Sequence, residues 1–454
     1  MGWVYFASMA AVVAVAFFFG RARANALPRP LHSLPGYHGW RLAIFAAVPM
    51  FVIFVAWSST VPRLLMDHAV ASLPQALQPA DDLQRATRIR EIEAVRNGTP
   101  SSDIAQETVA VAEQFASNAR LAGFAMLALG LGAALAGASY ARRGLVPDFR
   151  ARHTVERFVT IVLIGCSTIA VLTTVGIVAS VLFETIRFFT LVSPIEFLFG
   201  THWSPQTAIR ADQVGSSGAF GFVPLFVGTI LIMLVAMVVA VPIGLFAAIF
   251  MAEYASPATR AYVKPILEVL AGIPTVVYGF FAALTVAPLI RDIGRSTGLD
   301  VSSESALAAG IVMGVMIMPF ISSLADDVIN AVPQSLRDGS YAMGATKSET
   351  IKKVVLPAAL PGIVSAVMLA ISKAIGETMI VVMAAGLAAN LTFNPLNSVT
   401  TITVQIATLL VGDQEFDSAK TLSAFALGFV LFAFTLALNV IALQIVKKYR
   451  EQYD

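Results

Sequence analysis

The sequence predicts an all-α polytopic membrane protein, and three observations carry that prediction. Of its 454 residues, 57% are hydrophobic and only 13% are charged, whereas soluble domains carry about 25% charged residues to keep their surface hydrated. The mean hydropathy is +0.79. Apolar runs near the ~20 residues that a helix needs to cross a bilayer recur along the chain. A set of soluble domains is therefore excluded.

Nine segments are apolar enough to be predicted as transmembrane helices. Arginine and lysine gather after the first span, between the third and fourth, before the eighth and after the last. Nine spans put all four clusters on one side, which the positive-inside rule makes cytoplasmic. We therefore expect an external N-terminus and a cytoplasmic tail at 447–454. The predicted spans lie near residues 3–20, 41–60, 119–139, 158–183, 220–250, 264–290, 305–325, 358–388 and 421–446.

The first three spans differ from the rest. Residues 1–140 are expected to form an N-terminal extension, which a basic linker, 141–157, joins to six spans at 158–446. The polar insert at about 62–119 has no lysine and more acids than arginines, which predicts an external segment. Within it, Asp82–Glu93 has the pattern of an amphipathic helix that begins with acids, as the helix dipole favours. The insert is either a docking or regulatory domain or a solvated helical spacer.

Composition excludes several classes of function. A net charge of +2 does not provide the concentrated basic face that nucleic acid requires. The single cysteine, Cys166, rules out an internal disulfide and a cysteine-cluster metal site, and we expect no cofactor. No Gly-x4-Gly-Lys-Ser/Thr run is present, so the chain cannot hold nucleotide phosphates through a P-loop and is not expected to be an enzyme.

The loop at 326–357, between the seventh and eighth spans, is the most informative stretch. It predicts a short helix, a turn at Gly344 and a second helix from Ser348. Pro357 then opens the next span, at a position where proline is favoured. Glycine is required at 344 if the turn takes a positive φ. A helix–glycine–helix segment suits a loop that receives force from a cytoplasmic partner.

Two charged residues lie inside the predicted eighth span. Lys373 and Glu377 are four residues apart, so we expect them to share one helix face. Inserting either charged side chain at the bilayer centre costs about 2.5–3.5 kcal/mol. Each should therefore face a polar pathway, or the two should face one another. In the first case Lys373 attracts a passing oxyanion, and in the second the two residues form a structural ion pair.

Two other features concern the helix ends. Asp326 and Asp327 end the seventh span and are either solvated acids or gating residues. Pro274, two residues after Gly272, is expected to kink the sixth span.

The loop and the charged span resemble permease subunits of bacterial ATP-binding-cassette (ABC) importers. The family pattern is Glu-Ala-Ala, three residues, Gly, nine residues, Ile, one residue and Leu-Pro, and this chain keeps its spacing with a degenerate triplet and Val for Ile. Gly-Glu-Thr-Met at 376–379 further resembles the PstC-type permeases of phosphate importers. The pattern falls on Asp338, Gly339, Ser340, Gly344, Val354, Leu356 and Pro357.

The resemblance covers about residues 158–446 and implies a six-helix type I importer permease core, preceded here by three extra spans. It implies a multi-pass protein of the inner membrane, embedded in the lipid bilayer, that translocates inorganic phosphate. The implied partners are a second permease subunit of the PstA type, a dimer of ATPase subunits of the PstB type and an external phosphate-binding protein of the PstS type, with no nucleic acid.

By the same resemblance, the pattern residues would couple the chain to its ATPase, and Lys373 and Glu377 would line the translocation pathway. Two alternatives are a permease for another oxyanion, such as molybdate or sulfate, and a secondary transporter that works without an ATPase. The Gly-Glu-Thr-Met run argues against the first alternative, and the spacing of the loop argues against the second.

Overall fold

The computed structural model describes residues 2–28, 30–99, 105–206, 218–411 and 417–450. Within these ranges nine helices are long and apolar enough to cross a membrane, which is the number predicted. The chain divides into two compact units, Met1–Val171 and Leu172–Asp454. The boundary falls inside a helix of 41 residues, α5 (Ala151–Leu191). Each unit is described by itself.

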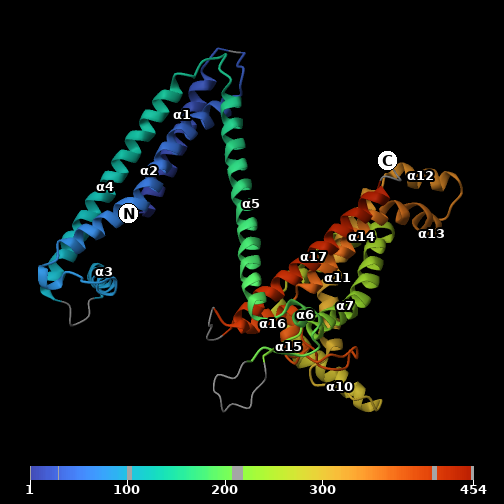
Figure 1. Cartoon of the computed structure of the whole chain (residues 1–454). Helices are drawn as coiled ribbons and strands as arrows, with labels where there is room; N and C mark the ends of the chain where they lie inside the picture. The colour runs from blue at the N-terminus through green and yellow to red at the C-terminus, as the bar shows by residue number, and fades with distance from the viewer. Residues whose placement is uncertain (1, 29, 100–104, 207–217, 412–416, 451–454) are drawn as a thin grey trace. The chain divides into compact units, whose positions relative to one another are not determined.

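The first unit is built from three long helices, of which α1 and α4 both pack along α2 (Figure 1). The hydroxyl of Tyr5 donates to the carbonyl of Met50 at 2.7 Å, so a polar group buried between α1 and α2 is satisfied. The elements of this unit are α1 (Gly2–Asn25), α2 (Pro35–Ala71), the 3-10 turn η1 (Gln75–Leu77), α3 (Asp82–Arg96), α4 (Gln106–Arg142) and the first part of α5.

The amphipathic helix predicted in the polar insert is confirmed as α3. The side chain of Asp81 caps it by accepting a hydrogen bond from the backbone of Gln84 at 2.7 Å. Ile92 is fully buried in a small cluster with Ala112 and Phe115 of α4. Helix α3 is thus packed on the first part of α4.

The second unit contains the remaining helices and one short pair of antiparallel strands, in which Trp203 pairs with Phe220. Three of its helices include a π-helical turn. In chain order its elements are the end of α5, α6 (Pro194–Phe199), β1 (Trp203–Ser204), β2 (Ala219–Phe220), α7 (Val223–Ile249), the π turn η2 (Phe250–Tyr254), α8 (Pro257–Ala271), α9 (Thr275–Phe281), the π turn η3 (Ala282–Val286), α10 (Ala287–Ser296), α11 (Ala306–Ala331), α12 (Gln334–Ala342), α13 (Lys347–Thr350), the π turn η4 (Ile351–Val355), α14 (Leu356–Ile375), α15 (Met379–Ala384), α16 (Ile402–Leu409) and α17 (Ala419–Arg450).

Helices α7 and α11 form the most closely packed pair of this unit. A Cβ on Gly314 of α11 would lie 2.8 Å from the carbonyl oxygen of Ala236, and one on Gly310 would lie 2.5 Å from the side chain of Val235. Small residues four apart let two membrane helices approach this closely, because helix association in lipid depends on packing rather than on the hydrophobic effect.

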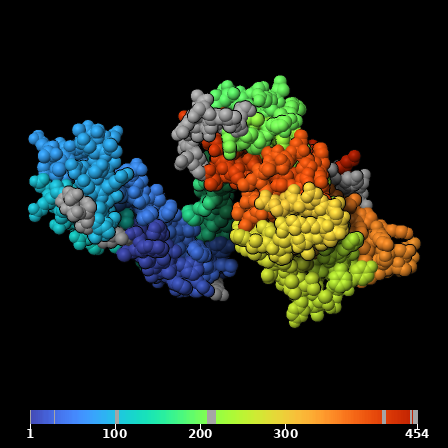
Figure 2. Space-filling model, turned by 90° about the horizontal axis from the view of Figure 1, so that it is seen from below, coloured from blue at the N-terminus to red at the C-terminus, as the bar shows by residue number. Residues whose placement is uncertain are grey.

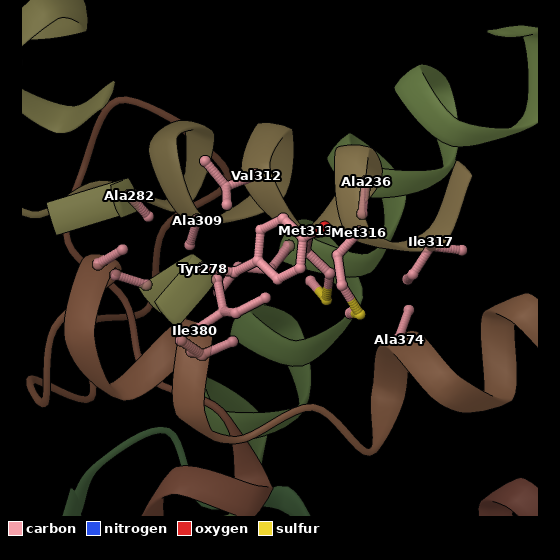
Figure 3. Close-up of a cluster of buried hydrophobic side chains, with 14 of the residues drawn as sticks. Ala236, Tyr278, Ala282, Ala309, Val312, Met313, Met316, Ile317, Ala374 and Ile380 are labelled. Carbon is pink, nitrogen blue, oxygen red and sulfur yellow. The ribbon is translucent and has the colours of Figure 1, made fainter. Parts of the chain in front are cut away.

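The main core lies where α7 and α11 meet the shorter helices (Figure 3). Tyr278 of α9 and Ile380 of α15 point toward Met313 and Met316 of α11, and Ala374 of α14 completes that side. The cluster also includes Val404 of α16, so six helices share it, and the ends of α9, α14 and α15 are held against α11.

The sixth span differs from its predicted range of 264–290. The chain forms two helices, α8 and α9, separated at Gly272–Pro274, and the membrane-length helix is Thr275–Ser296. Pro274 has no N–H to donate to the carbonyl of Leu270, and the hydroxyl of Tyr278 donates to that carbonyl instead, at 2.8 Å. The expected kink is thus a complete break, and α8 is a separate helix.

Candidate functional site

The loop between α11 and α14 has the predicted helix–turn–helix form. Gly344 has a φ of +83°, the left-handed conformation that only glycine adopts without strain. Its N–H donates to the carbonyl of Tyr341 at 2.9 Å, and the N–H of Ala345 donates to that of Ser340 at 3.2 Å. This pair of bonds is a Schellman motif, which ends α12.

Thr346, only two residues after the glycine, is the N-cap of the second helix, α13. Its hydroxyl accepts from the N–H of Glu349 at 3.3 Å, and the Glu349 carboxylate accepts from the N–H of Thr346 at 2.9 Å. This capping box corresponds to the sequence pattern Thr-x-x-Glu, which by itself indicates a helix start at this position. The hydroxyls of Ser340 and Thr350 lie 2.8 Å apart and join the two halves of the loop.

The predicted coupling residues occupy three parts of this loop. Asp338, Gly339 and Ser340 lie in α12, and Gly344 forms the turn. Leu356 and Pro357 begin α14, and Val354 lies in the π turn just before them, so the second amphipathic helix is continuous with the eighth span. Figure 1 shows α12 and α13 at one end of the second unit and α15 and α16 at the other.

Lys373 and Glu377 do not share a helix face, which corrects the prediction. Helix α14 ends at Ile375, and Gly376 caps it, so the four-residue spacing no longer places the two side chains on one surface. No carboxylate in the described part of the chain lies within 4.0 Å of the Lys373 ammonium. The structural ion pair is therefore contradicted.

Each of the two residues has a different neighbour. The exposed Lys373 has its Nζ 5.3 Å from the centre of the Phe320 ring of α11, a cation–π contact. The carboxylate of Glu377 accepts from the N–H of Met379 at 3.0 Å and from that of Ile380 at 3.4 Å, and so caps α15. Within the described residues, Lys373 therefore contacts an aromatic ring rather than a carboxylate, and the carboxylate of Glu377 is engaged with the first turn of α15.

The two groups of candidate residues are far apart. Seventeen positions of one helix separate Leu356 from Lys373, which is about 25 Å at 1.5 Å per residue. The coupling loop and Lys373 are joined directly by α14, which packs against α11 and α17.

Asp326 is the centre of a charged cluster that the sequence did not reveal. Its side chain is fully buried, and its carboxylate accepts from Arg260 at 2.8 Å and from Lys264 at 3.2 Å, both on α8. Asn330, one turn later on α11, donates to the same carboxylate at 2.9 Å. Asp326 is therefore not a solvated acid. The sequence did not indicate its partners, because residue 264 was predicted to lie in a membrane span.

The neighbouring Asp327 remains 61% exposed and accepts from Lys264 at 2.8 Å. This hydrogen bond is the main cause that raises the pKa of Lys264, so the ammonium stays charged throughout the physiological range. Arg260 and Lys264 also line a cavity of about 580 Å³ together with Glu268. The cluster holds α8 on α11 at the loop end of the unit.

Comparison with known proteins gives two family matches that together cover most of the chain. Residues 6–173 match the model of a family described as phosphate ATP-binding cassette transporter. Residues 240–451 match the model of the binding-protein-dependent transport system inner membrane component. The second match includes the coupling loop, Lys373 and Glu377.

Curated relatives agree with these matches. The chain is 34% identical over 240 residues to the probable ABC transporter permease protein YqgH of Bacillus subtilis, covering 53% of this chain and 74% of that protein. It is 30% identical over 264 residues to the phosphate transport system permease protein PstC of Xylella fastidiosa, covering 55% of this chain and 77% of that protein.

Among solved structures, the MetNI methionine ABC transporter in an inward-facing conformation is 19% identical, with a TM-score of 0.37, over 50% of this chain and 94% of that one. The two family matches and the relatives show that the chain belongs to the binding-protein-dependent inner membrane components of ABC transporters, in their PstC-type phosphate permease branch.

Proposed function

We propose that this chain is the permease subunit through which an ATP-driven importer moves inorganic phosphate across the cytoplasmic membrane. The observation that carries the proposal is the α12–Gly344–α13 segment, an exposed helix–turn–helix that is continuous with the span bearing Lys373. A membrane channel or a secondary transporter has no need of such a segment, whereas a permease driven by an external ATPase does.

The surface of α12 supports an ATPase as the cytoplasmic partner. Met343 is 88% exposed, and Leu336 and Tyr341 are 45% and 40% exposed. Methionine and tyrosine are enriched at the centres of protein interfaces. In Figure 2 the orange loop projects from one edge of the second unit, so a partner can reach it. The proposed partners are an ATPase dimer of the PstB type, a second permease of the PstA type and an external phosphate-binding protein of the PstS type.

The choice of substrate follows from the relatives and from Lys373. The PstC proteins are named for phosphate transport, and a bare phosphate anion in an apolar passage needs a compensating cation. A lysine ammonium is a point charge without the bidentate fork of arginine, which suits brief passage more than tight binding. Specificity would then reside in the binding protein, and Glu377 would act by capping α15 beside the pathway.

The proposed orientation puts the coupling loop and the C-terminal tail in the cytoplasm. The lysines of the loop, Lys347, Lys352 and Lys353, and those after the last span, Lys447 and Lys448, support it through the positive-inside rule. With nine spans, the N-terminus and the insert that contains α3 then lie outside.

The test is uptake by the complete complex in proteoliposomes. The chain is co-purified with its ATPase, second permease and binding protein, and uptake of radiolabelled phosphate, sulfate and molybdate is measured with and without ATP inside. We expect ATP-dependent uptake of phosphate alone. Uptake of sulfate or molybdate in preference to phosphate would assign another oxyanion, and uptake that continues without the ATPase would refute the importer mechanism.

A further inference from the structure

Arg337 joins three elements at the base of the coupling loop. It lies in α12, is only 8% exposed, and its Nη2 donates to the Glu253 carboxylate at 2.9 Å and its Nε at 3.1 Å. The same guanidinium donates to the carbonyl of Val332 at 2.6 Å and to that of Ile329 at 2.8 Å. These carbonyls end α11, where helical partners run out.

Glu253 belongs to the π turn η2 at the end of α7, and its side chain is 6% exposed. A carboxylate buried this deeply requires a partner, because its charged form is costly away from water. Next to it, Tyr254 receives Lys347 of α13 over its ring, at 4.9 Å. Both helices of the coupling loop therefore contact the same turn of α7, although the chain itself connects the loop only to α11 and α14.

We propose that Arg337 is a positioning residue that fastens the coupling helix α12 to the end of α7 through Glu253, so that a displacement of α12 moves α7 and α11 as one body. This inference rests on the proposed function, since it assumes an ATPase that displaces α12. Its consequence reaches the pathway, because Phe320, which contacts Lys373, lies on α11.

A lysine or a glutamine at 337 could not replace this arginine. Three acceptors on two helices require the fork of donors that only a guanidinium provides. The contact also differs from the exposed ion pairs of the chain, such as Arg152 with Glu156, whose side chains are 61% and 48% exposed and which contribute little to stability. Arg152→Gln is therefore a matched control for loss of an ion pair.

The first measurement is the number of phosphate ions imported per ATP hydrolysed, in the purified complete complex in proteoliposomes. Glu253→Ala is expected to lower this ratio about tenfold while ATP hydrolysis continues, because removing one partner of a buried charge pair is strongly disruptive. Glu253→Gln keeps an acceptor of the same shape and is expected to lower it only about twofold to threefold, since a neutral hydrogen bond is roughly half as strong. Arg152→Gln should leave it unchanged.

A merely structural role predicts another result. The yield or thermal stability of the complex would then fall in Glu253→Ala, and the complex that remains would import as many phosphate ions per ATP as the wild type. An unchanged ratio would overturn the proposal. A wild-type complex that hydrolyses ATP but imports no phosphate would refute the proposed substrate instead, and the second measurement does not depend on the substrate.

That second measurement is the distance between α12 and α7 in the same complex. Spin labels are attached to Ser335→Cys of α12 and Phe246→Cys of α7, both exposed, in a Cys166→Ser background. We expect one distance distribution in the nucleotide-free and ATP-bound wild type, and a shift on ATP binding in Glu253→Ala. The same distribution in both variants and both states would overturn the proposal.

Discussion

Replacing Gly344 by alanine tests whether the turn of the coupling loop requires a left-handed residue. No heavy atom lies within 4 Å of the position that a Cβ would take there, so collision with neighbours contributes nothing. The cost is then the backbone strain of an L-residue at a φ of +83°, about 1–2 kcal/mol. A penalty of that size lowers the population of the native turn roughly fivefold to thirtyfold.

Gly339 in α12 provides the matched control. A Cβ at this position would also meet no atom within 4 Å, and Gly339, unlike Gly344, does not have a positive φ. Alanine at 339 is therefore expected to stabilise α12, by about 1 kcal/mol, because glycine is a poor helix former. Asparagine at 344 tolerates the left-handed region and should preserve most of the turn.

The assay is ATP hydrolysis by the complete complex in proteoliposomes, with and without the phosphate-loaded binding protein. Gly344→Ala should reduce the rate of ATP hydrolysis with the loaded binding protein several-fold and leave the rate without it unchanged. Gly344→Leu should have the same effect. Gly344→Asn and Gly339→Ala should remain near the wild type. Equal losses in Gly339→Ala and Gly344→Ala would refute the reasoning, because the two positions differ in φ and not in the space around them.

Three further predictions use other parts of the chain. In a background without the native cysteine, Leu83→Cys, at a position that is 78% exposed, should react with an impermeant thiol reagent from outside and Ser348→Cys should not; reversed labelling would invert the topology. Lys373→Gln should lower phosphate uptake at least tenfold with assembly intact, and full uptake would exclude its role in the pathway. Asp326→Asn should lower the stability of the complex by about 1–3 kcal/mol in thermal unfolding, because two charge-assisted hydrogen bonds weaken while the cations can turn to water. Arg260→Gln should cost less than Asp326→Asn, since Lys264 still pairs with the carboxylate, and the opposite order would contradict this account.

Hydropathy predicted the number of spans because each membrane helix needs a long apolar run, and that need is local. It did not predict where the sixth span begins. Apolar residues continue across Gly272–Pro274, and a hydropathy window cannot detect that the Tyr278 hydroxyl donates to the Leu270 carbonyl, to which Pro274 has no N–H to donate. The positive φ of Gly344 was predictable, because a glycine between two amphipathic segments has few other uses.

The pairing of charges was less accessible. Four-residue spacing predicted that Lys373 and Glu377 share a face, but Gly376 ends the helix between them. The partners that were found, Arg260 with Asp326 and Arg337 with Glu253, are 66 and 84 residues apart along the chain. Contacts over such separations depend on how helices pack, which no local pattern in a single sequence encodes.

The close approach of α7 and α11 has a consequence for how this protein can vary. A side chain larger than hydrogen at Gly310 or Gly314 would collide with α7, at 2.5 Å in the first case and 2.8 Å in the second. At Gly314 the collision cannot be relieved by a side-chain movement, because the opposing atom is a backbone oxygen. In a library of all single substitutions these two sites should tolerate almost no replacement, while apolar positions on the outer side of α7, such as Val238, should accept nearly any hydrophobic residue. Natural divergence would then accumulate along the outward faces of the helices and leave this seam unchanged.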